Sequence, residues 1–166
     1  MAAGSTYTPI ATTTLGSDQA SVTFSSISGS YTDLVLVSNV KVSSAGEAVQ
    51  IRFNSDSGNN YSYTQLSGNG TSAASSRSRN TSIIYISNDG SATNYGTAIT
   101  QIMNYSNTTT YKTTLGRFSE ASATSWADVG LWRNTAAITS VTLNVSGTSK
   151  NLSSGSTFTL YGIAAA

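Results

Sequence analysis

Short stretches in which hydrophobic and polar residues alternate run along the whole chain. A period of two places every second side chain on the same face of a β-strand. The clearest example is VTLNVS at residues 141–146, and we expect further strands at residues 21–24, 34–42, 49–54, 83–86, 98–105, 113–118, 129–132 and 158–163. No segment of roughly ten or more residues carries the hydrophobic stripe of an amphipathic helix, so the pattern predicts an all-β chain.

The segments between these stretches are rich in Gly, Asn, Asp and Ser, as in SSISGS and SGTSKNLSSGS. These residues supply the backbone conformations and local hydrogen bonds that turns require. Short strands separated by polar turns are typical of a β-sandwich or barrel. With about eight to ten strands, we expect a jelly-roll-like β-sandwich with two sheets packed face to face. Nothing in the sequence marks a boundary, so residues 1–166 are predicted to form a single domain.

Two segments fall outside the alternating pattern. Residues 67–80, SGNGTSAASSRSRN, are predicted to form the longest loop, either mobile or ordered by a neighbouring subunit. Arg77 and Arg79 in this loop are candidates for binding an acidic neighbouring subunit through bidentate pairing. The alternative is that both side chains lie in a solvated loop. Residues 1–15 include Pro9 and are expected to form an extended N-terminal arm or an edge strand.

Composition narrows the chemistry that such a sandwich could perform. The chain has no His and no Cys, and only 9% of its residues are charged. Imidazole and thiol groups are the side chains most used for acid–base, covalent and transition-metal chemistry near neutral pH. We therefore expect a scaffold or a binding surface and not an enzyme, with no cofactor and no metal site. The net charge of +1 and the scattered Lys and Arg residues argue against nucleic-acid and membrane partners.

Four aromatic residues are the candidates for a binding site: Tyr61, Tyr63, Trp126 and Trp132. Aromatic faces stack on sugar rings, and nearby Asn and Asp side chains could bind the hydroxyl groups of a glycan. The competing interpretation, which we favour, is that these side chains pack in the core or in a subunit interface.

Two further groups of residues suggest chemistry less strongly. NSDSGNN at residues 54–60 resembles part of a calcium loop, but no Glu follows at the required position, which favours a hairpin turn. Glu120 and Asp128 flank Trp126 and could be imagined as the carboxylate pair of a glycosidase. The other acidic residues are dispersed, which favours roles in turns and in solubility.

Several segments of the sequence resemble small virion structural proteins of tailed phages, especially phages of cyanobacteria and other aquatic bacteria. They are YTPIATTTLGSDQASVTFSSI, YTDLVLV, IRFNSDSGNNYSYTQLSGNG, MNYSNTTTYKTTLGR, VGLWRNTAAITSVTL and the ending FTLYGIAAA, which together cover nearly the whole chain. The resemblance implies a β-sandwich that forms part of the phage particle, as a capsid decoration (cement) protein or as a fibre or appendage subunit. It carries over no catalytic residues.

These considerations lead to three hypotheses about function. The leading one is a decoration protein on the outer capsid surface, a homotrimer whose partners are the major capsid protein and its own copies. The second is a tail-fibre, receptor-binding or carbohydrate-binding module that recognises a host surface glycan. The third is a glycan-degrading enzyme that uses Glu120 and Asp128, which the sparse acidic residues make the weakest. The first two place the protein in the virion, on the capsid exterior or on an appendage.

Overall fold

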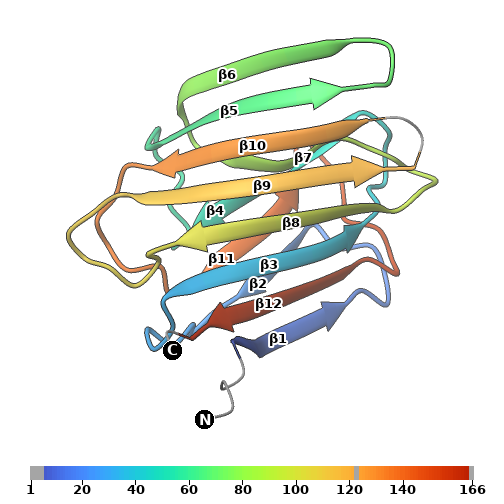
Figure 1. Cartoon of the computed structure of the whole chain (residues 1–166). Coiled ribbons are helices and arrows are strands. Elements are labelled where there is room, and N and C mark those ends of the chain that lie inside the picture. The colour runs from blue at the N-terminus through green and yellow to red at the C-terminus, as the bar shows by residue number, and fades with distance from the viewer. Residues whose placement is uncertain (1–5, 122–123, 165–166) are drawn as a thin grey trace.

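The computed structural model describes residues 6–121 and 124–164, which form twelve β-strands arranged in two antiparallel sheets (Figure 1). The all-β sandwich predicted from the sequence is confirmed, with twelve strands in place of the eight to ten expected. Within the described residues no helix is long and apolar enough to cross a membrane.

The large sheet contains eight strands and lies toward the viewer in Figure 1. Its order across the sheet is β1, β12, β3, β8, β9, β10, β5 and β6, and each neighbouring pair is antiparallel. The strands are β1 (Tyr7–Thr14), β12 (Thr157–Ile163), β3 (Asp33–Val40), β8 (Gly96–Met103), β9 (Lys112–Glu120), β10 (Ser125–Trp132), β5 (Tyr61–Gly68) and β6 (Ala73–Thr81).

The small sheet contains four strands and lies behind the large one in Figure 1. Its order is β2 (Ser21–Phe24), β11 (Val141–Val145), β4 (Glu47–Phe53) and β7 (Ile84–Gly90). The edge strand β7 packs against β8, β9, β10 and part of β5. The small sheet therefore covers the middle of the large sheet and does not extend to β6.

The hydrophobic core fills the space between the two sheets. Alternating residues of β11 and β4 face inward, and Val141, Leu143, Ile51 and Phe53 are completely buried. Burying an aliphatic or aromatic side chain of this kind contributes about 1.5–3 kcal/mol. The alternation that predicted these strands is therefore also the pattern that holds the sandwich together.

The prediction of a loop at residues 67–80 is wrong, because most of this segment forms the hairpin of β5 and β6. Asn69 closes the turn, and its side-chain oxygen accepts hydrogen bonds from the backbone N–H groups of Thr71 (3.1 Å) and Ser72 (2.8 Å). Arg77 and Arg79 consequently lie on an edge strand and not in a loop. Most residues of β6 are exposed on both faces of the strand. A strand with no buried face needs no alternation, so the sequence carried no sign of it.

The N-terminal segment forms an edge strand over the part that the structure describes. β1 pairs with β12, and the register shifts between Pro9 and Ala11. Proline is tolerated at such an irregular edge because it has no N–H to donate to a neighbouring strand. Residues 1–5 of the predicted arm lie outside the described residues.

We expect Gly130→Ala to destabilise the protein, because Gly130 allows the close approach of the two sheets. A Cβ at this position would lie 2.4 Å from Thr114 Oγ1 and 2.8 Å from Ile84 Cδ1 and Cγ2. Overpacking of this kind costs about 1–3 kcal/mol, to be measured by urea unfolding. Gly16→Ala is the matched control, since nothing lies within 4 Å of a Cβ there. Equal unfolding free energies for the two variants would contradict this account of the packing.

Candidate functional site

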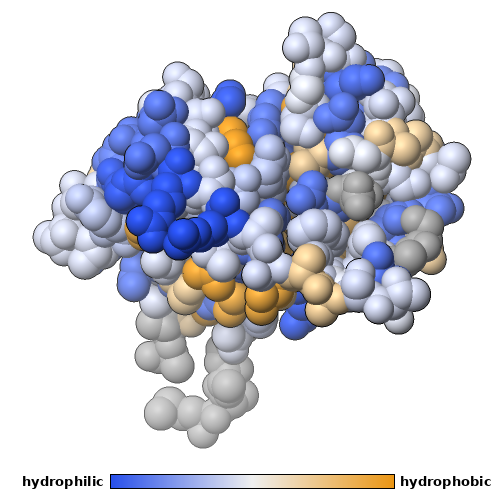
Figure 2. Space-filling view, turned by 90° about the horizontal axis from the view of Figure 1, so that it is seen from above, coloured by the Kyte–Doolittle hydropathy of each residue, from blue (hydrophilic) through white to orange (hydrophobic). Residues whose placement is uncertain are grey.

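The face of the large sheet that points away from the small sheet, called the open face below, is the leading candidate for a functional surface. Its central side chains come from β3, β8, β9, β10 and β5 and are Val35, Ile99, Gln101, Leu115, Arg117, Val129, Leu131, Thr64 and Leu66. Of the six exposed large hydrophobic residues in the described part of the chain, four lie on this face, namely Tyr7, Leu66, Leu115 and Val129. Figure 2 shows hydrophobic residues gathered along this side, at the bottom of the view.

In the middle of β9 and β10 the usual distribution of polar and apolar residues is reversed. Leu115 and Val129 face outward and are 49% and 53% exposed. On the inner side, Gly116 and Asp128 are cross-strand partners. Strands of a soluble sandwich normally direct their apolar residues toward the core and their polar residues toward water. The reversal places apolar side chains on the open face and polar or small residues beneath it.

The open face carries positive charge and shallow hollows. One hollow lies between β6 and β9, where Thr64, Arg77, Arg79, Thr113, Val129 and Leu131 are among its lining residues. Another is lined by Tyr7, Val35, Leu115 and Arg117. The arginines Arg77, Arg79 and Arg117 form no ion pair with a carboxylate of the described residues. The surface thus combines apolar contact area with cations that an acidic neighbour could engage.

Two of the four aromatic candidates belong to the core. Tyr61 and Trp132 are completely buried, and their rings stack with centroids 6.2 Å apart and an interplanar angle of 20°. The Trp132 indole donates a hydrogen bond of 2.8 Å to Asp56 Oδ2. Burial raises the pKa of Tyr61 to about 12. A glycan cannot stack on these rings, so the packing interpretation is confirmed for this pair.

The other two aromatic candidates lie nearer the surface. Tyr63 is partly buried and packs edge-to-face against Tyr85 of β7, with centroids 5.1 Å apart. Trp126 is half-buried at the beginning of β10, beside one hollow lined by residues of β8, β9 and β10 and another lined by residues of the β5–β6 hairpin. Its indole N–H is buried and has no hydrogen-bond partner among the described residues. The structure therefore does not bring the four aromatic residues together into one platform.

The resemblance of residues 54–60 to a calcium loop is explained by a hydrogen-bonded turn. The Asp56 carboxylate accepts hydrogen bonds from Gly58 N (2.8 Å), Asn60 Nδ2 (2.9 Å) and Trp132 Nε1 (2.8 Å). Burial alone would raise the pKa of Asp56, but these hydrogen bonds outweigh it and hold the pKa below its usual value. The described residues contain no group of three or more acidic side chains that could hold a metal ion.

The two carboxylates considered as a glycosidase pair are buried and far apart. Asp128 is 2% exposed and Glu120 is 8% exposed. Asp128 lies opposite Gly116, and Glu120 is four residues farther along β9, a separation of about 13 Å at about 3.3 Å per residue. Glycosidases place their carboxylates about 5–9.5 Å apart in an accessible cleft. This arrangement does not match that requirement.

Comparison with known proteins adds no assignment to this geometry. No protein-family model matches the sequence, and no curated protein is similar to it.

A row of buried polar residues, called the inner polar row, crosses the large sheet beneath the open face. Thr100, Gly116, Asp128 and Gln65 are successive cross-strand partners on β8, β9, β10 and β5. The Asp128 carboxylate leans over Gly116, where a Cβ would lie 2.6 Å from Oδ1. Asp128 Oδ2 has no hydrogen-bond partner among the described residues, and burial raises the pKa of this carboxyl to about 7.

This burial predicts a pH dependence that Asp128→Asn should remove. An unfolded Asp has a pKa of about 3.9, so between about pH 4 and 7 the folded state binds the proton more tightly. The free energy of unfolding contributed by Asp128 is therefore greatest below pH 4. It falls as the pH rises through about 7, with a slope of up to about 1.4 kcal/mol per pH unit. Urea unfolding of both proteins at several pH values measures this. Parallel pH profiles for wild type and Asp128→Asn would contradict the assignment.

Proposed function

We propose that this protein is a non-enzymatic structural subunit of a phage particle, a capsid decoration protein that binds the outer surface of the shell. The resemblance of its sequence phrases to small virion proteins of tailed phages supports a place in the particle. The reversed polarity of β9 and β10, with Leu115 and Val129 turned outward, supports a role based on a covered surface. This reversal is the observation that carries the proposal.

The open face suits a permanent neighbour better than a small ligand. Its hollows are shallow and open, whereas sites for small molecules are concave and bury most of the ligand. Exposed hydrophobic residues gathered on one face mark a protein contact more often than a solvated surface. Each square ångström of apolar surface removed from water contributes about 25 cal/mol. The neighbours we propose are the major capsid protein and further copies of this chain in a homotrimer.

The mechanism in this proposal is mechanical. Each copy adds buried interface across adjacent capsid subunits, and binding to the assembled lattice stabilises the lattice by mass action. The low charge of the chain is compatible with a protein held in an assembly. Glu120 and Asp128, the carboxylates weighed for catalysis, are buried and widely separated, which supports a role without chemistry.

A tail-fibre or glycan-binding role is the second candidate, and it rests on Trp126. This side chain is half-buried beside hollows at one end of the sandwich, one of which is also lined by Ser119 and Ser125. An indole next to hydroxyl groups has the chemistry to stack on a sugar ring. A single aromatic residue gives less contact than the broad open face, so this role is the weaker of the two.

The copy number of the chain in purified particles separates these roles. We expect quantitative mass spectrometry to find roughly one copy for each major capsid protein. A ratio of a few per cent would contradict the decoration role and move the protein to the tail. Absence from the particles would overturn the structural role altogether.

A further inference from the structure

The free edge of the large sheet at β6 has the features of a strand-binding site. β6 is the last strand in the order of the large sheet, and it is nine residues long. Seven of its residues are exposed, and Ser78 and Thr81 are half-buried. Figure 1 shows β6 at the top of the large sheet, above the upper edge of the small sheet that lies behind. Its outer edge therefore offers backbone groups to a partner.

The hairpin fixes which backbone groups of β6 point outward. Asn69 N donates to Ser72 O (3.2 Å), which makes these two residues a hydrogen-bonded pair. Hydrogen-bonded pairs recur at every second position of an antiparallel ladder, so Ala74 and Ser76 bond to β5. The N–H and C=O groups of the residues between them, including Ser75 and Arg77, then point away from β5.

The other edges of the two sheets carry features that discourage pairing. β1 contains Pro9 and an irregular register, and β2 is only four residues long. β7 has two register irregularities against β4 and packs on the large sheet. Natural β proteins protect their edges with prolines, bulges and short strands. β6 has one register irregularity, at its end between Arg79 and Thr81, so residues 73–79 are the longest run of regular edge pairing among the described strands.

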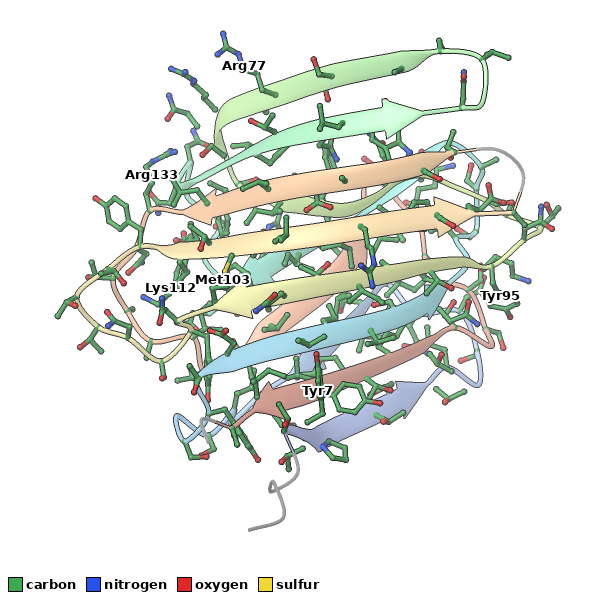
Figure 3. All side chains as sticks on the ribbon, in the orientation of Figure 1. Tyr7, Arg77, Tyr95, Met103, Lys112 and Arg133 are labelled. Atoms are coloured by element: carbon green, nitrogen blue, oxygen red, sulfur yellow. The ribbon has the colours of Figure 1, made fainter. Side chains whose placement is uncertain are left out.

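The side chains of β6 specify a partner with negative charge. Its sequence, AASSRSRNT, combines small residues that permit close approach with two arginines. Arg77 and Arg79 lie opposite Thr64 and Ser62 of β5, on the open face, and form no ion pair with the described residues. Figure 3 shows Arg77 projecting beside β6, with Arg133 near the same end of the sheet.

We propose that β6 binds an extended acidic segment of a partner protein, which joins the large sheet as an additional strand. Main-chain hydrogen bonds supply affinity in this mode of recognition, and alternate side chains supply specificity. Carboxylates at every second position of the partner would face Arg77 and Arg79. A second β6 is a poorer partner, because pairing would gather the arginines of both copies on one face. This inference concerns the sheet edge; it shares Arg77 and Arg79 with the open face but does not require the role proposed there.

The test uses a fluorescein-labelled peptide of alternating Thr and Glu residues and measures its binding to the full-length protein by fluorescence anisotropy. We expect saturable binding, with little binding of the corresponding Thr–Lys peptide. Methylating alternate backbone nitrogens of the Thr–Glu peptide blocks strand pairing without altering the protein. This change should weaken binding by roughly tenfold or more, as expected for lost main-chain hydrogen bonds.

Two variants of the protein separate backbone pairing from charge. Ser75→Pro removes an outward N–H without removing a bond to β5, and should weaken binding by roughly tenfold. Ser75→Ala keeps the N–H and controls for loss of the hydroxyl group. Replacing Arg77 and Arg79 together by Ser should also weaken binding. The proposal is overturned by no binding at about 1 mM peptide, by equal binding of the methylated peptide, or by β6-dependent self-association in place of peptide binding.

Discussion

The four-stranded sheet is narrower than the eight-stranded sheet. It therefore covers only part of the inner face of the large sheet, and this decides which strands are buried and which are exposed. β7 reaches β8, β9, β10 and part of β5, and the core forms where the two sheets overlap. Beyond this overlap β6 is exposed on both faces, and no described residues form a layer over the outer side of the large sheet. The exposure of β6 follows from the unequal sheets, whereas the open face is the outward side of a two-layer sandwich.

The reversed distribution of polar and apolar residues in β9 and β10 affects both the interior and the open face. Leu115 and Val129 occupy the outward positions, so the inward positions fall to Gly116, Asp128 and Gly130. Glycine at two of these sites makes room for Asp128 and Ile84. The result is an interior with an unpaired carboxyl, which lowers stability at neutral pH. A covered outer face offsets such a cost, because the apolar surface then contributes to assembly.

The strands that could be predicted are those with one buried face. Residues 141–146 and 49–54 alternate because their inner side chains fill the core, and period two follows directly. β6 could not be predicted as a strand, because neither of its faces is buried and its Ser, Ala and Arg residues are typical of loops. The open face could not be predicted either, for a different reason. The sequence shows that Leu115 and Val129 are apolar, but assigning them to the core assumes that apolar residues point inward, which is untrue here.

In the proposed function, the open face is the surface through which the protein would bind a phage particle. The most direct test compares Leu115→Asp with Ser21→Asp, which adds the same charge to an exposed position of β2 in the small sheet. Co-sedimentation with particles stripped of the protein measures binding of each variant. We expect Leu115→Asp to lose binding and Ser21→Asp to bind like wild type. Full binding by Leu115→Asp, or loss confined to Ser21→Asp, would contradict this proposal.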